Sequence, residues 1–357
     1  MSRNKFFFFG CWNYDNCKEG GLDYRKGVID MIANEIDRYS FGIIAGDNAY
    51  ARDDDVYYKR TIEYGFELLR GLSRPLYDAI GNHEVVDDVV LQHEQAQKLL
   101  AVSEDMHVAD KDGFRIVTIN TNLFSHKIKN KDKPSGDALL DQFRRLLLCP
   151  YQGWTIVVGH EPLISQKRKG SHFKTSSLII FDKLIAIMAQ CKRVVYMCAD
   201  VHEFQAWNIY YGNSIIPMIV VGTGGAIPDT PLGVQDYSIN NINNTGIQAL
   251  LVATQPAYGY CEVALEKDYL AVNYVPLLGC GDKPEQVHLL INKNKETSLL
   301  TETKSRKSKS LECQAPVIDE DVCADKRVLY KKPPKLKPSS SALPLSVAEK
   351  EHLPLPR

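Results

Sequence analysis

Short apolar runs alternate with amphipathic stretches from about residue 5 to residue 275, and this alternation leaves few architectures open. Short apolar runs rich in Val, Ile, Phe and Tyr are typical of buried strands. Stretches with apolar residues at helical spacing are typical of helices that pack on a sheet. The alternation therefore predicts an α/β layered fold.

The predicted strands share a high content of β-branched and aromatic residues, and they cover residues 5–9, 42–45, 75–80, 114–120, 155–158, 193–197 and 217–221. Residues 259–276 are typical of two further strands joined by a turn at Lys267 and Asp268. The predicted helices cover residues 24–39, 55–72, 92–100, 137–148 and 177–190.

The composition changes beyond about residue 283. Residues 303–310 are rich in Lys and Ser, and residues 331–344 in Lys, Pro and Ser. Such segments bury too little apolar surface to offset the entropy lost on ordering. We therefore expect a folded domain at residues 1–282 and a disordered, low-complexity tail at residues 283–357. The basic residues of the tail leave open a tether to a partner or to nucleic acid.

The overall charge is close to neutral, with 43 Lys and Arg against 44 Asp and Glu. It gives no whole-chain basis for binding nucleic acid or an acidic membrane. The apolar run from Phe6 to Phe9 is too short for a signal-peptide core or a bilayer span, so we expect no membrane insertion. The nine cysteines include no CxxC pair, which favours reduced thiols in an intracellular protein of undefined compartment. The oligomeric state is not predicted.

Five short polar clusters each follow directly on an apolar run. They are Gly10-Cys11-Trp12-Asn13, Gly46-Asp47-Asn48-Ala49-Tyr50, Gly81-Asn82-His83-Glu84, Gly159-His160-Glu161-Pro162 and Ala199-Asp200-Val201-His202. Loops at strand ends are where α/β proteins commonly build their sites. Each cluster taken alone also fits a turn, a helix N-cap or a structural histidine. Together they offer oxygen and nitrogen donors, which suit manganese, iron or zinc.

In order and spacing, the clusters resemble the calcineurin-like metallophosphoesterase superfamily, and within it the purple acid phosphatase-like branch. Gly46-Asp47-Asn48-Ala49-Tyr50 is similar to the Gly-Asp-x-x-Tyr motif of that branch, and Gly81-Asn82-His83-Glu84 to its Gly-Asn-His-Glu motif. Residues 158–162 and 221–226 also resemble family segments. The resemblance covers residues 5–276 and implies a four-layer α-β-β-α sandwich, in which helices flank two mixed sheets.

The resemblance also implies two divalent or trivalent metal ions, most readily Fe, Mn or Zn, that share a carboxylate and a hydroxide. By position, Asp47 would bridge the metals; Asn82, His160 and Asp200 would complete one shell; and Cys11, Asn13 or Tyr50, and His202 would serve the other.

Substrate contacts are implied in the same way. Asn82 and His83 would contact the phosphate, and His83 would protonate the leaving oxygen. His172 falls where related phosphatases often carry a histidine that faces the substrate. Lys167 and Lys169 lie in the same predicted loop, where their charge would hold a phosphate.

The chain departs from the family pattern in two clusters. Cys11 stands where relatives carry Asp, and Asn13 where many carry His. The fifth cluster begins Ala199-Asp200 instead of Gly-His. Both metal shells are therefore altered, although by side chains that can also bind metals. Cys11 as a small buried residue and Tyr50 as a packed aromatic remain alternatives.

The predicted function is acid phosphatase-like hydrolysis of a small phosphomonoester by a metal-bound hydroxide at a dinuclear site. A phosphodiesterase or nuclease would use the same site, although only residues 127–133 and 167–169 offer basic clusters for nucleic acid. A catalytically impaired binding protein of this fold is a further alternative. A scaffold that acts mainly through its tail is the last.

Overall fold

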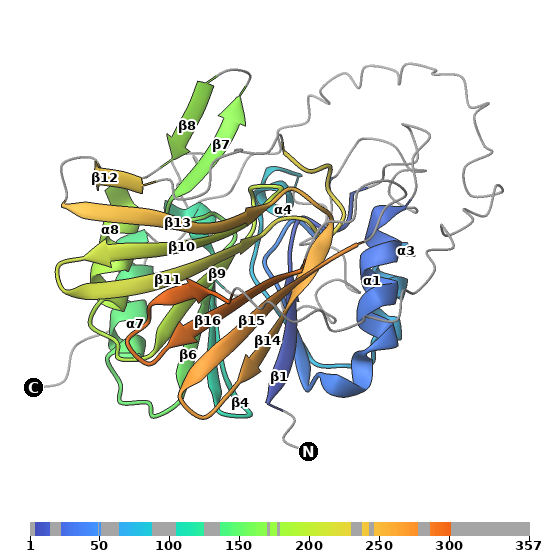
Figure 1. Ribbon diagram of the computed structural model, residues 1–357, viewed down its shortest axis with the longest axis horizontal. Coiled ribbons are helices and arrows are strands. Elements are labelled where there is room, and N and C mark those ends of the chain that lie inside the picture. Colours follow the sequence, from blue (N-terminus) through green and yellow to red (C-terminus); the bar gives the residue numbers. More distant parts are fainter. Residues whose placement is uncertain are drawn as a thin grey trace, which may run out of the picture. The chain divides into compact units, whose positions relative to one another are not determined.

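The computed structural model describes residues 4–14, 23–48, 50, 64–87, 105–124, 136–169, 172–176, 179–229, 238–242, 246–277 and 286–300. In this part of the chain, two large mixed sheets face each other and helices cover their outer faces (Figure 1). One sheet has seven strands and the other has eight. The predicted α/β sandwich of two mixed sheets is therefore confirmed.

The first sheet contains, in spatial order, β17 (Thr297–Leu299), β16 (Val287–Asn292), β15 (Tyr269–Pro276), β14 (Gly259–Leu265), β1 (Lys5–Phe9), β2 (Phe41–Ile44) and β3 (Leu76–Asp78). β1, β2 and β3 run parallel, whereas β14 pairs with β1 in the antiparallel direction. Because parallel strands end at the same edge, the polar clusters that follow these three strands come together there.

The second sheet contains, in spatial order, β12 (Ser238–Ile242), β13 (Ile247–Gln255), β10 (Phe204–Tyr211), β11 (Ser214–Val221), β9 (Val194–Cys198), β6 (Trp154–Val158), β5 (Phe114–Ile119) and β4 (Met106–Lys111). Its neighbours β5, β6, β9 and β11 are parallel. The clusters that follow β6 and β9 are therefore neighbours as well.

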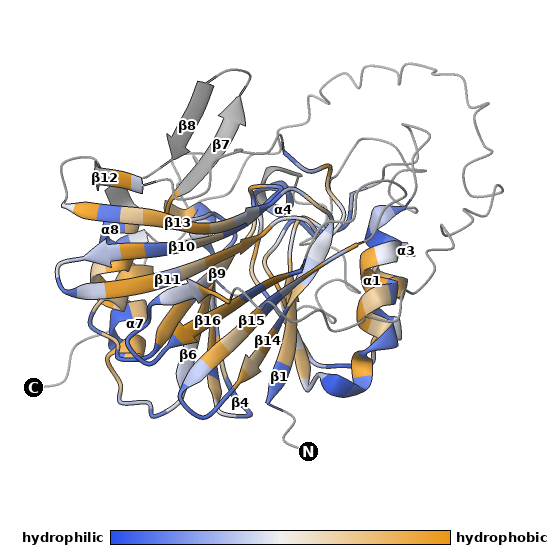
Figure 2. Cartoon of the chain, viewed as in Figure 1, coloured by the Kyte–Doolittle hydropathy of each residue, from blue (hydrophilic) through white to orange (hydrophobic). Residues whose placement is uncertain are grey.

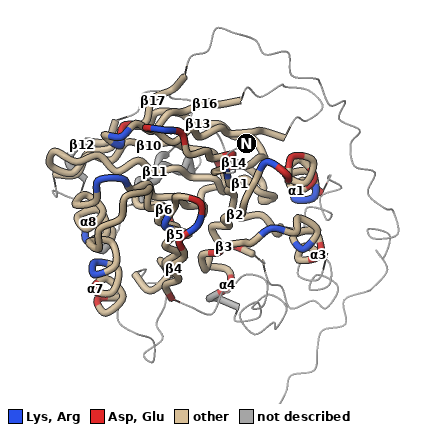
Figure 3. The backbone as a smooth tube through the Cα atoms, turned by 90° about the horizontal axis from the view of Figure 1, so that it is seen from below, with Lys and Arg blue, Asp and Glu red and all other residues tan. Residues whose placement is uncertain are grey.

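Helices cover the outer faces of the sheets. The longer ones are α1 (Tyr24–Asn34), α3 (Tyr64–Gly71), α7 (Gly136–Leu147) and α8 (Ile179–Met188). The shorter elements are the helix α4 (Asn82–Asp87), the 3-10 helices η2 (Ile36–Arg38) and η4 (Thr121–Phe124), and a hairpin of β7 (Ser165–Lys169) and β8 (His172–Ser176). Figure 3 shows α1 and α3 beside the first sheet and α7 and α8 beside the second, and α1, α3 and α7 carry charges of both signs.

Strand periodicity builds two hydrophobic cores, because alternate side chains of a strand point to opposite faces. Ile156 and Val158 of β6 join a cluster that combines both sheets with α1 and α3, whereas Val157 joins one that combines the second sheet with α7 and α8. Both faces of the central strands are thus buried, and β9 and β11 are hydrophobic along most of their length (Figure 2).

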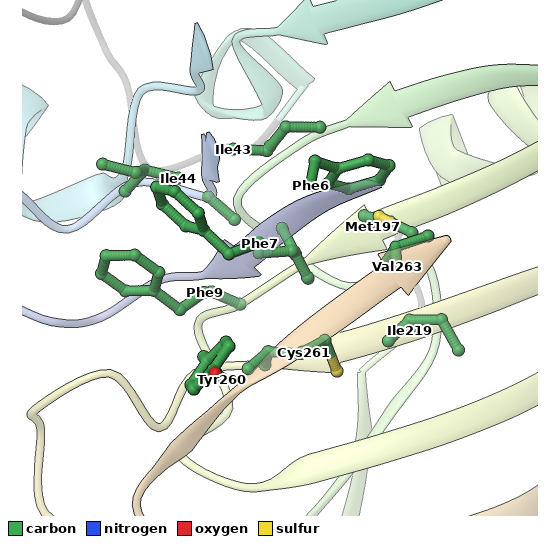
Figure 4. Packing of buried hydrophobic residues seen from close by; sticks show 14 of the residues in the cluster. Phe6, Phe7, Phe9, Ile43, Ile44, Met197, Ile219, Tyr260, Cys261 and Val263 are labelled. Carbon is green, nitrogen blue, oxygen red and sulfur yellow. The ribbon is translucent and has the colours of Figure 1, made fainter. Parts of the chain in front are cut away.

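The four phenylalanines of β1 are all fully buried. Phe6 lies with Met197 and Val263 between strands of the two sheets (Figure 4). Its ring stacks on that of Phe41 at 4.9 Å and meets the edge of Phe114, from the other sheet, at 5.1 Å. The aromatic run of β1 is therefore one of the contacts that join the sheets.

Several sequence predictions need correction. The sheet continues past the predicted domain boundary at residue 282, because β15 pairs with β16 and β16 with β17. The predicted loop begins and ends in strands, since residues 167–169 belong to β7 and His172 to β8, and Lys169 pairs with His172 in the backbone register. The predicted helix at residues 24–39 ends at Asn34 and continues as η2. The strands β4, β10, β12 and β13 were not predicted.

Other predictions fall outside the described residues, namely the helix at residues 92–100, the first part of the helix at residues 55–72 and the tail from residue 301. None of the helices within the described ranges has both the length and the apolar character needed to cross a bilayer.

Replacing Phe6 with Ala tests whether this contact joins the two sheets. We expect Phe6→Ala to lower the free energy of unfolding by about 3 to 5 kcal/mol, because it removes ring contacts on both sides and leaves a cavity. Urea unfolding measures the change. The control is Leu148→Ala at a side chain that is 46% exposed, where a change within about 0.5 kcal/mol is expected. A similar loss in both variants would contradict this role for Phe6.

Candidate metal centre

The loops that follow the central strands of both sheets are tied together by backbone hydrogen bonds. The amide of Cys11 donates to the carbonyl of Gly46 at 3.0 Å, and that of Ala199 donates to the carbonyl of His160 at 2.9 Å. Gly10 lets the two sheets approach, since a Cβ atom there would lie 2.6 Å from that of Ala199. Four of the predicted clusters therefore meet at one place.

Three residues of these loops adopt left-handed backbone conformations, with φ of 48° at Cys11, 54° at Asp47 and 60° at Asp200. This region disfavours residues other than Gly, Asn and Asp, at a cost of about 1 to 3 kcal/mol each. Each residue sits directly after the short link that follows a central strand, namely β1, β2 or β9. The sharp turns aim three side chains at the space between the loops.

Asp47 lies at the centre of this space and is only 2% exposed. Its Oδ1 accepts a hydrogen bond from the backbone amide of His83 at 3.2 Å and lies 3.2 Å from Nε2 of His160. Its Oδ2 lies 3.6 Å from Sγ of Cys11. The two oxygens of one carboxylate thus face two different sets of side chains.

His160 belongs to the first set. Its Nδ1 lies 2.6 Å from the carbonyl oxygen of Ala45, which can only accept, so Nδ1 carries a proton. Its Nε2 then faces the Oδ1 atoms of Asn82 at 3.0 Å and Asp200 at 3.7 Å, besides that of Asp47. Burial lowers the pKa of His160, but the charges of Asp47 and Asp200 outweigh burial and raise it. Several electron-pair donors therefore converge on one point.

Cys11 and His202 belong to the second set. Ligand atoms of Cys11, Asp47 and His202 all lie within 4.8 Å of one another. Nδ1 of His202 lies 3.0 Å from the carbonyl oxygen of Ile227, which fixes the proton on Nδ1 and leaves Nε2 with a lone pair. Burial and the charges of Asp47 and Asp200 raise the pKa of the Cys11 thiol.

Tyr50 lies beside this second set. Its side chain is 6% exposed, and its hydroxyl group makes no hydrogen bond of ordinary length to any residue that the structure describes. Burial and the charge of Asp47 raise the pKa of this hydroxyl. A buried hydroxyl without a partner costs about 1 to 3 kcal/mol, and a cation at this point would supply the partner. The orphaned hydroxyl and the two converging donor sets show that these residues fit a metal site.

Asn13 is held away from both sets. Its Oδ1 accepts from Nη1 of the buried Arg25 at 2.7 Å, and its Nδ2 donates to the backbone carbonyl of Asn48 at 2.7 Å. Both ends of the amide are therefore engaged, and its oxygen faces a cationic guanidinium group. Of the two alternatives for the second shell, Asn13 and Tyr50, the geometry favours Tyr50.

The predicted substrate residues lie in two different elements, α4 and the β7–β8 pair. Asn82 and His83 lie in the first turn of α4 and not in a loop, and the ring of His83 lies 4.4 Å from that of Tyr50. The backbones of Lys167, Lys169 and His172 lie in the β7–β8 hairpin, while their side chains are outside the described part of the chain.

One supporting residue escaped prediction. Nδ2 of Asn122 donates to the carbonyl oxygens of Ile80 at 3.2 Å and Gly81 at 3.0 Å, directly before Asn82. It thereby ties the end of the second sheet to the loop of the first. The sequence contains a signal for this role. Residues 120–122 form a polar cluster directly after the apolar run of β5, just as each of the five predicted clusters follows an apolar run.

A substitution at Asn13 tests its placement outside the metal shells. We expect Asn13→Ala to destabilise the fold by about 1 to 3 kcal/mol, because the buried guanidinium of Arg25 loses an acceptor, and to leave the number of bound metals unchanged. Asp47→Asn should lower that number. Metal analysis of the purified variants gives the comparison. A folded Asn13→Ala protein that has lost a metal would show that Asn13 is a ligand.

Comparison with known proteins supports the fold at low sequence identity. No family model matches the sequence, and a search of curated proteins finds no match. Among solved structures, GAP50, the anchor in the inner membrane complex of Plasmodium, is 15% identical with a TM-score of 0.57, over 85% of this chain and 90% of that chain. Purple acid phosphatase PPD1 from yellow lupin (Lupinus luteus) seeds is 14% identical with a TM-score of 0.58, over 79% and 52%.

A third structure, PhoD, is 13% identical with a TM-score of 0.56 and covers 85% of this chain and 72% of that chain. Identities this low show a shared fold, and they do not assign an activity. Two mixed sheets with outer helices, and loops that meet at the ends of their central strands, agree with that likeness. The chain has the calcineurin-like metallophosphoesterase fold.

Proposed function

We propose that this chain is a metal-dependent phosphoester hydrolase that acts on a small phosphomonoester. The main support for this proposal is the position of Asp47. Its Oδ1 lies 3.2 Å from Nε2 of His160, and its Oδ2 lies 3.6 Å from Sγ of Cys11. A buried carboxylate with one oxygen in each of two donor sets is the arrangement that lets one side chain hold two cations. The fold shared with a purple acid phosphatase and with PhoD supports the same reaction class.

The residues divide between two metal positions. Asn82, His160 and Asp200 would hold one ion, and Cys11, Tyr50 and His202 the other, with Asp47 shared. Two bound cations, most readily Fe, Mn or Zn, supply Lewis acidity at the attacking and leaving oxygens of an in-line displacement. Burial of Asp47 and His160 keeps water away from these ligands and strengthens their electrostatic interactions.

In this proposal His83 acts on the substrate. Its backbone amide is fixed to Asp47, while its ring is half-buried against Tyr50 at the edge of the site. An imidazole there can donate a hydrogen bond to a phosphate oxygen and pass a proton to the leaving oxygen. Asn82, one residue earlier, aligns the same turn with His160.

Hydrolysis of model substrates tests the proposal. We expect p-nitrophenyl phosphate to be hydrolysed faster than bis(p-nitrophenyl) phosphate once iron, manganese or zinc is supplied. Asp47→Asn and His160→Ala should abolish turnover, because each removes a donor from the centre. Leu148→Ala, at an exposed side chain that belongs to neither donor set, is the matched control. Faster cleavage of the diester would replace the proposed substrate class with a phosphodiester.

A leaving-group series tests the role of His83. His83→Ala should slow hydrolysis of a phenyl phosphate by about 10²- to 10⁴-fold, since phenolate needs the proton, and slow p-nitrophenyl phosphate less. Equal slowing of both esters would contradict proton donation by His83. If the metal-loaded wild type hydrolyses neither ester, the fold serves as a binding protein instead.

A further inference from the structure

The two donor sets that share Asp47 differ in their chemistry. The set around His160 contains one nitrogen, Nε2 of His160 itself. It also contains three oxygen atoms, one each from Asp47, Asn82 and Asp200. Around Cys11, the donors are a sulfur, a ring nitrogen of His202 and Oδ2 of Asp47, with the hydroxyl of Tyr50 beside them. Oxygen-rich sites suit harder ions such as Mn²⁺, whereas thiolates select softer ones such as Zn²⁺.

The backbone at Cys11 is unfavourable for a cysteine that only fills space. Its φ of 48° lies in the left-handed region, where a side chain costs about 1 to 2 kcal/mol relative to Gly and where Asp or Asn is tolerated better. The side chain is fully buried, and its sulfur points toward Oδ2 of Asp47. The ligand atoms of Cys11, Asp47 and His202 lie within 4.8 Å of one another. A strained residue whose sulfur faces ligands is expected where the sulfur itself has a role.

The hydroxyl group of Tyr50, beside Cys11 and Asp47, gives independent support for a cation at this position. More than nine-tenths of this side chain is buried, and within the described ranges its oxygen forms no hydrogen bond of ordinary length. Both Cys11 and Asp47 act electrostatically on this hydroxyl. A buried hydroxyl group that faces a thiol and a carboxylate, and makes no hydrogen bond of ordinary length to a described residue, points to a cation shared by all three groups.

We propose that Cys11 is a thiolate ligand and that it makes its metal position selective for zinc-like ions over manganese, while the position around Asp200 keeps the preference of an oxygen-rich site. This inference rests on the metal centre of the proposed function, and it does not depend on hydrolysis. Cys11 thus sets the identity of the metal at its position and not only its presence.

Cobalt spectroscopy on the full-length, reduced protein tests the ligand. Co²⁺ is the probe, because a thiolate bound to it gives a charge-transfer band in the near ultraviolet. We expect the band in the wild type, its loss in Cys11→Ser and Cys11→Asp, and its retention in Cys261→Ser. Cys261 is the matched control, since it is also a fully buried free thiol but lies in β14. Cys11→Asp should fold, because Asp tolerates the left-handed backbone.

Metal competition tests selectivity. After incubation with one equivalent of Zn²⁺ and excess Mn²⁺, the wild type should retain zinc, and Cys11→Asp should lose a larger share of its zinc to manganese than the wild type does. No band in the wild type, a band that survives in Cys11→Ser, or unchanged zinc retention in Cys11→Asp would each overturn the inference. A charge-transfer band in a protein that hydrolyses no ester would support Cys11 as a ligand and contradict the proposed function. Hydrolysis by a protein without the band would support the proposed function and contradict Cys11 as a ligand.

Discussion

The carboxylate of Asp47 is the group on which the arrangement of the site depends. A left-handed turn after β2 places it in the space between the loops, and Gly81 leaves room for it, since a Cβ there would lie 2.4 Å from Oδ1. The amide of His83 then fixes one oxygen, which leaves the other to face Cys11. Each donor set is defined by the oxygen of Asp47 that it faces.

The surroundings of Asp47 concentrate negative charge in a buried volume. Asp78 and Glu84 are buried nearby, and both contact the side-chain amide of Asn48. Burial, with the charge of Glu84, raises the pKa of Asp78, and burial, with the charge of Asp47, raises that of Glu84 to about 7. Buried carboxylates are costly unless paired with cations. A metal ion bound at Asp47 would offset the repulsion between the carboxylates of Asp47 and Glu84. Metal binding would therefore also stabilise the fold.

The sequence predicts the central strands well, because each is a short apolar run that is buried on both faces. Strand ends agree within a few residues for β1, β2, β5, β6 and β9, and the polar clusters that follow them form the site. The edge strand β3 and the antiparallel strands β14 and β15 were predicted as well, whereas β4, β12, β13, β16 and β17 were missed. β16, Val287–Asn292, exposes part of every second residue, and its pairing with β15 was hidden by the basic composition that follows.

The roles of individual side chains depend on contacts that no spacing predicts. The family resemblance implied a metal ligand at Asn13, yet Arg25, twelve residues later in α1, donates to its amide oxygen. Asn122 supports the Gly81 loop from the other sheet, which requires the packing of two sheets to be known. Local motifs therefore predict where a site lies, whereas tertiary contacts decide which residues serve it.

Locating bound metals by anomalous scattering, in crystals of the wild type grown with Mn²⁺ and Zn²⁺, tests most directly whether Asp47 bridges two cations. Two peaks about 3.5 to 4 Å apart, with one oxygen of Asp47 on each, are predicted. Anomalous peaks placed elsewhere, or an Asp47 carboxylate that binds no ion in fully loaded crystals, would contradict the bridging role.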